Sequence, residues 1–60
     1  MSLLNVHQVA EQLSISEKLT YRLLDRGDLP KIKIGAAVRV DPADLQAYIE
    51  RQRVEWAVRR

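Results

Sequence analysis

Between Ser16 and Gly27, basic residues recur every four positions, and leucines fall at spacings of four and five. In a helix the first set would form a cationic stripe and the second an apolar side. The basic residues are Lys18, Arg22 and Arg26, and the leucines are Leu19, Leu23 and Leu24. A short helix with these two sides is suited to lie between an apolar core and a negatively charged partner.

The limits of this helix are marked by residue types that begin and end helices. Ser16 fits the N-cap, because its hydroxyl accepts a hydrogen bond from a free backbone N–H in the first turn. Glu17 follows where the helix dipole favours a negative charge. Gly27 fits the left-handed position after a helix, and Pro30 blocks its continuation. The sequence therefore predicts a helix over residues 16–26.

Length and composition limit the chain to one small aliphatic domain. A chain of 60 residues buries only about 60% of its unfolded surface, so we expect modest stability. Cysteine is absent and His7 has only carboxylates as companion ligands, so we expect no disulfide, metal or cofactor. No signal-peptide core and no apolar run of about 20 residues occurs, which predicts a soluble cytoplasmic protein without a membrane segment.

The net charge of +2 is unevenly distributed along the chain. Residues 16–40 carry six basic residues against three acidic ones, a balance of +3, whereas residues 1–15 carry −1 and residues 41–60 are neutral. This asymmetry is expected of a nucleic-acid-binding face. A solvated surface explains the charge alone equally well.

A first helix is predicted before the basic one. Asn5 and Gln8 have the spacing of a capping box, and residues 3–4 would pack before it as an extended segment or a hydrophobic staple. The apolar residues with helical spacing are Val6, Val9, Ala10 and Leu13. Residues 14–16 leave room only for a tight turn. Two short helices so joined make a helix-turn-helix, whose second helix enters the DNA major groove, although helical hairpins also occur in proteins that bind nothing.

After Pro30 the chain alternates between apolar and charged residues, which predicts two half-buried strands. Residues 35–37 form the predicted turn between them, since Gly35 tolerates positive φ. The residues predicted to face inward are Ile32, Ile34, Val38 and Val40, and those predicted to face outward are Lys31, Lys33 and Arg39. This hairpin would be a basic wing beside the helix, or a structural hairpin whose charges keep an edge soluble.

The last predicted helix begins at Asp41, with Pro42 suited to its first position. Its inward residues are Leu45, Tyr48 and Ile49. The pattern fades afterwards, so residues 51–60 would extend the helix or fray, outside a core of residues 3–50. Trp56 would pack on its own domain or meet a second copy or partner through residues 50–60.

The order of helix, turn, helix, Gly-x-Leu-Pro, hairpin and capped helix resembles the excisionase-type helix-turn-helix family. This family is a branch of the winged DNA-binding modules related to the MerR regulators, and the match runs from Leu4 to about Arg51. The residues that carry it are Leu4, Val9, Ala10, Leu13, Ser16, Tyr21–Leu24, Gly27–Pro30, Lys33–Gly35, Val38–Val40, Asp44 and Leu45. The resemblance implies an α+β, mainly helical fold: a winged helix-turn-helix of two short helices, a two-stranded hairpin and a C-terminal helix.

By this resemblance, the helix over residues 16–26 would lie in the major groove of double-stranded DNA. The hairpin over residues 31–40 would lie on the backbone or minor groove. Tyr21 falls on the recognition helix, Arg22 is the expected base contact, ideally to guanine, and Ser16 and Thr20 are lesser candidates. The expected phosphate contacts are Lys18, Arg26, Lys31, Lys33 and Arg39.

The chain departs from the family pattern at three places. Ala36 and Ala37 stand where the family usually has basic residues after the hairpin glycine, so the tip is neutral. Glu17 stands where a basic residue is common. Leu19 and Thr20 replace the usual Thr and Val. Either Leu19 would contact a thymine methyl, or the helix would be rotated in its packing against the core. These changes predict a lower affinity than is typical of the family.

The family includes excisionases, which bend DNA and direct site-specific recombination, and small transcriptional regulators. Either role is expected here, with double-stranded DNA as the partner. The alternative is a protein-interaction adaptor or DNA-targeting domain of a larger phage or regulatory assembly, such as a terminase small subunit. We expect no enzyme and no small-molecule substrate, since the sequence has no nucleophile with an adjacent base and no glycine-rich phosphate loop.

Overall fold

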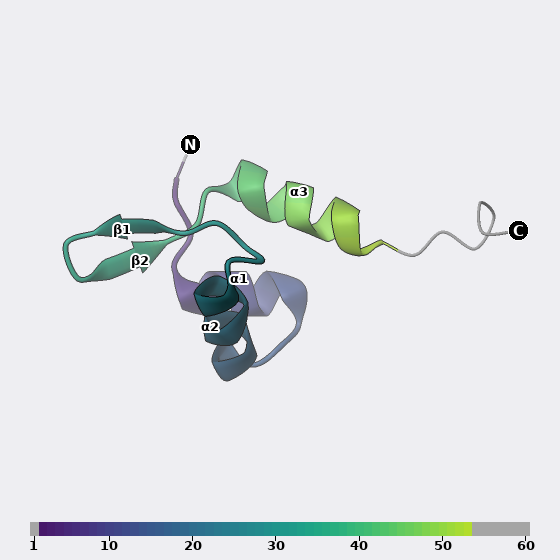
Figure 1. The fold of residues 1–60 in the computed structure, drawn as a ribbon, viewed down its shortest axis with the longest axis horizontal. Coiled ribbons are helices and arrows are strands. Elements are labelled where there is room, and N and C mark those ends of the chain that lie inside the picture. The colour runs from purple at the N-terminus through teal and green to yellow at the C-terminus, as the bar shows by residue number, and fades with distance from the viewer. Residues whose placement is uncertain (1, 54–60) are drawn as a thin grey trace, which may run out of the picture.

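The computed structural model describes residues 2–53, so the predictions for Trp56 and the rest of residues 54–60 lie outside the described residues. Its elements follow the predicted order (Figure 1). They are α1 (Val6–Leu13), α2 (Glu17–Arg26), β1 (Ile32–Ile34), β2 (Ala37–Arg39) and α3 (Pro42–Gln52). The mainly helical α+β fold and the winged helix-turn-helix arrangement are confirmed. None of the helices in this part of the chain is long and apolar enough to cross a membrane.

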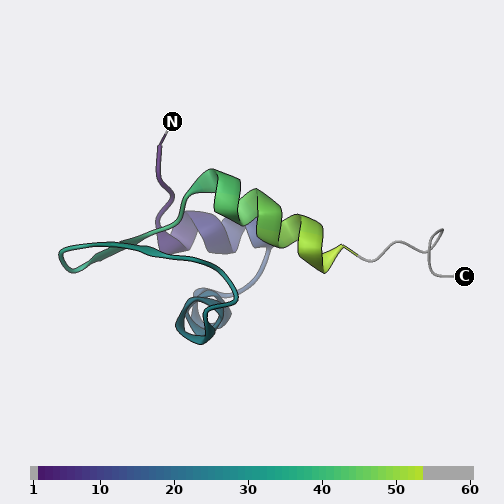
Figure 2. The same cartoon turned by 45° about the horizontal axis from the view of Figure 1, so that its top comes forward.

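The hairpin projects from one side of the molecule, and α3 is directed away from it (Figures 1 and 2). The base of the hairpin is anchored to the start of the chain. Leu4 and Val40 form an isolated antiparallel bridge, with N–H to O distances of 2.9 and 2.8 Å. Leu4 is therefore extended, and this bridge ties the segment before α1 to the segment that leads into α3.

The helix ends follow from local chemistry, as predicted. Asn5 and Gln8 form a reciprocal capping box, and the Ser16 hydroxyl accepts from the Leu19 N–H at 3.0 Å. Gly27 ends α2 with φ of 83°. Ser14 also takes left-handed backbone, with φ of 57°, a conformation that non-glycine residues adopt uncommonly. The short connection between α1 and α2 turns sharply at this residue.

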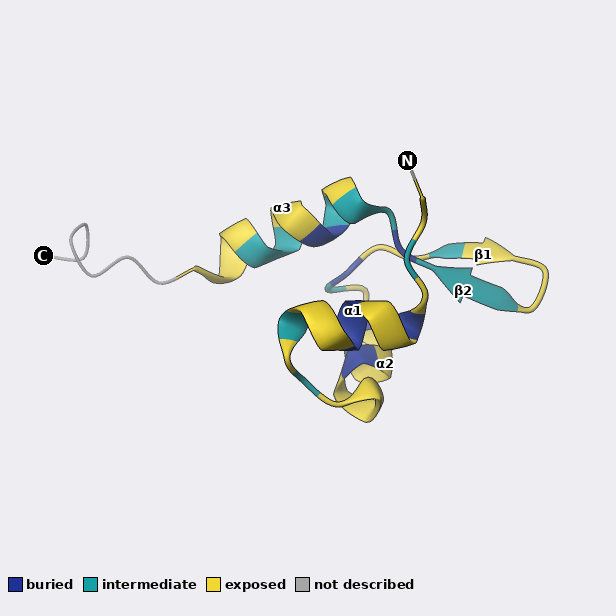
Figure 3. Ribbon diagram, turned by 180° about the vertical axis from the view of Figure 1, so that it is seen from behind, coloured by how far each residue is buried: buried dark blue, intermediate teal, exposed yellow. Residues whose placement is uncertain are grey.

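The core is aliphatic and is shared by every part of the fold. Figure 3 shows buried positions on all three helices and in the segments flanking the hairpin, whereas the hairpin tip is exposed. The buried cluster consists of Val6, Val9, Leu24, Leu29, Val40 and Leu45. Tyr48 and Ile49 of α3 pack against it as predicted.

The prediction that Leu19 faces the core is wrong. Leu19 is 39% exposed, while Thr20 beside it is fully buried. Thr20 and Leu24 are the buried residues of α2, and Leu23 is half-buried, so the helix is rotated relative to the leucine pattern. Burial of Thr20 is tolerated because its hydroxyl donates to the Ser16 carbonyl oxygen at 2.9 Å, so the buried hydroxyl has a hydrogen-bond partner.

The predicted inward facing of the hairpin residues is correct for Val38 and Val40 but wrong for Ile34, because the turn is one residue shorter than expected. Ala37 belongs to β2 and pairs with Ile34, so Gly35, with φ of 60°, and Ala36 form a two-residue turn. Glycine at the first position is typical of such turns. Directly opposed residues share a face, and a one-residue change in register exchanges the faces of a strand. Ile34 therefore lies opposite Ala37 rather than Val38.

In this register, Ile34 is exposed and Val40 is buried, although the sequence pattern predicts that both face inward. We expect Ile34→Thr to change the free energy of unfolding by about 0.5 kcal/mol or less, because Ile34 is 57% exposed. Val40→Thr should cost about 1–3 kcal/mol, because Val40 is fully buried and the added hydroxyl would be desolvated. Urea denaturation of the two variants measures the difference, and equal losses would contradict the register.

Candidate nucleic-acid interface

The cationic stripe of α2 faces solvent. Lys18, Arg22 and Arg26 are all exposed, and Tyr21 beside them is 49% exposed. The buried residues of this helix are Thr20 and Leu24, on its other side. The stripe therefore lies on the side of α2 that faces away from the core, where a partner can reach it.

Two of the basic residues in this region have acidic neighbours. Arg26 lies 3.2 Å from the Asp28 carboxylate, and the Lys31 ammonium lies 3.8 Å from that of Asp25. Such exposed pairs contribute about 0–1 kcal/mol, so a phosphate displaces them at little cost. Within residues 2–53, Lys18, Arg22 and Lys33 make no ion pair. These three cations are available without rearrangement.

The basic residues of the hairpin do not share one outward face, contrary to prediction. Arg39 lies opposite Ile32, and Lys33 lies opposite Val38, so the two charges point to opposite faces of the hairpin. Arg39 is half-buried, and its guanidinium donates to the Val38 carbonyl oxygen at 2.8 Å. Lys33 is exposed. The two charges are therefore presented to a partner from different sides of the hairpin.

Ser16 and Thr20, which were predicted as lesser base contacts, differ in their exposure to solvent. Thr20 is enclosed in the core and uses its hydroxyl on Ser16, so the prediction that it contacts a base is wrong. Its burial follows from the rotation of α2. Ser16 is exposed at the start of the helix, where its oxygen caps the Leu19 N–H.

A polar cleft lies between the start of α2 and the hairpin. Its lining comes from three parts of the fold: Asn5, Val6 and His7 at the start of α1, Glu17 and Tyr21 on α2, and Ala36, Ala37, Val38 and Arg39 in the hairpin. It brings the neutral hairpin tip, a carboxylate, a phenol and a guanidinium to one place.

His7 is the residue of this cleft that sequence reasoning missed, since it was expected on neither a pocket nor the basic face. Its Nδ1 lies 2.7 Å from the Glu17 carboxylate, and its Nε2 lies 3.5 Å from that of Glu11. The hydrogen bond to Glu17 and the charges of Glu11 and Glu17 raise the pKa of His7. Only the spacing of His7 and Glu11, four residues apart, was visible in the sequence. No group of three or more metal-ligand residues is arranged for a metal ion within residues 2–53.

A family model described as a helix-turn-helix domain matches residues 3–53, which includes every element of the fold. The chain belongs to this helix-turn-helix family. Comparison with curated proteins and with solved structures finds no significant match.

In this helix-turn-helix domain, α2 holds the place of the second helix, the one that enters the major groove in DNA-binding members of the class. It is also the helix that carries the exposed cationic stripe. The family match and the charge distribution therefore select the same element.

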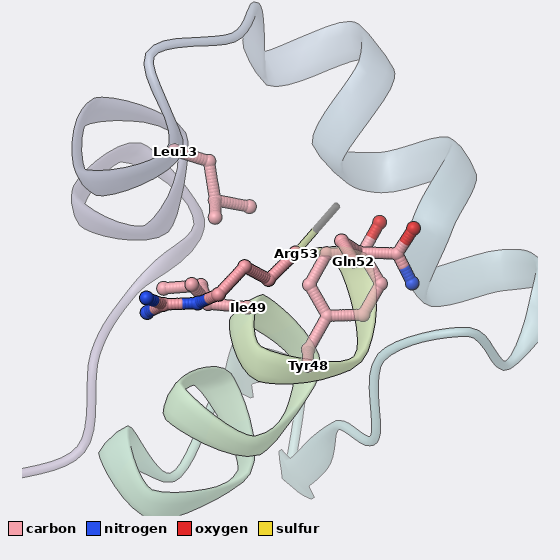
Figure 4. A pocket seen from close by; sticks show the side chains of 5 residues that line it. All are labelled: Leu13, Tyr48, Ile49, Gln52 and Arg53. Carbon is pink, nitrogen blue, oxygen red and sulfur yellow. The ribbon is translucent and has the colours of Figure 1, made fainter. Parts of the chain in front are cut away.

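The domain has a second concave surface, which is apolar. It lies between the end of α1 and the last turns of α3 and is lined by Leu13, Tyr48, Ile49, Gln52 and Arg53. Figure 4 shows Leu13 pointing across it toward Ile49. An adjoining hollow adds Ile15, Leu19 and Leu23. This groove offers few groups that would bind phosphate.

Proposed function

We propose that this protein binds double-stranded DNA, with α2 in the major groove and the hairpin on the flanking backbone or minor groove. The observation that carries the proposal is the exposed cationic stripe on the second helix of a helix-turn-helix. A major groove about 12 Å wide admits such a helix.

Within this proposal, Arg22 reads a base, ideally guanine, because it lies mid-helix on the exposed face and pairs with no acid among the described residues. Lys18 and Lys33 contact phosphates, and Arg26 and Lys31 join them after leaving Asp28 and Asp25. Ser16 adds a contact at the start of the helix. Tyr21 lies beside Arg22.

The biological role we propose is that of a small excisionase-like or MerR-like cytoplasmic protein, acting in recombination or in transcriptional regulation without catalysis. The support is the shared order of elements, including the Gly-x-Leu-Pro turn after α2. One module of this size buries little DNA surface, so several copies on one site would raise the affinity.

The test is fluorescence anisotropy with a labelled random duplex over a range of salt concentrations. Three to five phosphate contacts predict a slope of log K against log[salt] of about −3 to −5. Lys33→Ala should make the slope shallower by about 1, whereas Lys31→Ala should change it less, because Lys31 is paired with Asp25. Absence of binding at low salt would reject the proposal.

The second candidate is an adaptor in a phage or regulatory assembly, such as a terminase small subunit. The apolar groove between α1 and α3 favours it (Figure 4), with a second copy of this chain as its occupant. Sedimentation velocity with and without DNA tests this candidate. A strict monomer in both conditions would reject self-association, and salt-dependent DNA binding separates the two candidates.

A further inference from the structure

The polar cleft between α2 and the hairpin lies where a DNA strand would cross. If α2 occupies the major groove and the hairpin lies on the flanking backbone, one phosphodiester strand passes between these two elements. Residues of those two elements line the cleft, together with residues at the start of α1. This inference rests on the proposed function.

We propose that the cleft contains a phosphate seat, a site that binds one DNA phosphate between His7, Tyr21 and Arg39. Protonation of His7 favours phosphate binding at this seat, because it offsets the negative charge of Glu17. The three residues come from α1, α2 and β2 respectively, and all line the cleft. Each has a hydrogen-bond donor for phosphate: the Nε2–H of protonated His7, since its Nδ1 contacts Glu17, the phenolic O–H of Tyr21 and the guanidinium of Arg39. Arg39 uses one nitrogen on the Val38 carbonyl and retains other N–H groups.

Glu17 makes the seat sensitive to pH. Its carboxylate lines the cleft and would repel a phosphate, so the seat is unfavourable while His7 is neutral. Protonated His7 donates to Glu17 across the 2.7 Å contact and offsets its charge. The groups that face His7 are Glu11 on its own helix, Glu17 and Tyr21 on α2, and Arg39 on the hairpin.

The direction of the effect follows from these charges. The carboxylates raise the pKa of His7 above its ordinary value, so protonation begins at a higher pH than for a free histidine. A bound phosphate also favours the imidazolium. DNA affinity should therefore increase as the pH falls through this range, and DNA binding should raise the pKa of His7 further.

The experiment measures binding of one random duplex at about pH 8 and about pH 6, on either side of the reference histidine pKa of about 6.5. The wild-type protein should bind about threefold more tightly at the lower pH, the modest effect expected of an exposed charge. His7→Gln should abolish this dependence, and Glu17→Gln should tighten binding at the higher pH. Glu50→Gln is the matched control, because it removes a carboxylate of α3 that does not line the cleft, and it should leave the pH dependence unchanged.

A second measurement keeps the proposal testable if a variant fails to fold. His7 is the only histidine, so its ring NMR signals report its pKa directly in the wild-type protein. We expect that pKa to rise when duplex is added. An unchanged or lower pKa, or an undiminished pH dependence in His7→Gln, would overturn the seat while leaving DNA binding intact. Absence of duplex binding at both pH values would instead overturn the proposed function itself.

Discussion

Leu29→Ala should lower the free energy of unfolding by about 2–5 kcal/mol, a large part of the protein's stability. Leu29 is fully buried in the turn between α2 and the hairpin, within the buried cluster to which all three described helices contribute. Truncating such a leucine costs about 2–5 kcal/mol. A domain of 60 residues has a total stability of only about 3–9 kcal/mol, so this one change removes much of it.

Thermal and urea denaturation followed by circular dichroism measure this loss. Leu19→Ala is the matched control, because it makes the same chemical change at a position 39% exposed on α2. We expect Leu19→Ala to cost much less than Leu29→Ala. Equal losses in the two variants would show that the core is assigned incorrectly.

Arg22→Ala should weaken binding to the preferred DNA site by about 1–3 kcal/mol, roughly five- to 150-fold, and relax its sequence specificity. The reason is the position of Arg22 on the exposed face of the second helix, with no acidic partner in the described part of the chain. The preferred site is first selected from a random duplex pool. Affinities of wild-type and variant protein are then measured for that site and for a random duplex.

Lys33→Ala is the comparison for this prediction. Lys33 is an exposed cation of the hairpin, and loss of a phosphate contact weakens all sequences alike. Arg22→Ala should instead lose more on the selected site than on the random duplex. Equal losses of Arg22→Ala on both duplexes would overturn its base-reading role and leave it as a phosphate contact.

The predictions that succeeded depend on short stretches of chain. The capping box of Asn5 and Gln8, the cap at Ser16 and the left-handed Gly27 each involve residues within four positions of one another. Both partners of each hydrogen bond are close in the sequence, so the pattern can be recognised without the tertiary structure. The order of elements, and hence the winged helix-turn-helix, followed from these signals.

The predictions that failed depend on how the elements pack. The leucines of α2 indicated one buried side, but the contact with the core places Thr20 there, because its hydroxyl is satisfied within the helix. In the hairpin, the choice between a two- and a three-residue turn reverses the facing of a strand. The bridge between Leu4 and Val40 holds the base of the hairpin in the observed arrangement.

The sequence by itself determined where α1 and α2 begin and end, where α3 begins, which residues carry the charge, and that the second helix presents a cationic stripe. Local hydrogen bonding and helical spacing are sufficient for these features. Only the tertiary structure decided that Lys33 and Arg39 lie on opposite faces, that Thr20 is buried, and that His7 contacts Glu17 ten residues away. Those outcomes depend on strand register, helix rotation and the sharp turn at Ser14, which arise from packing rather than from local pattern.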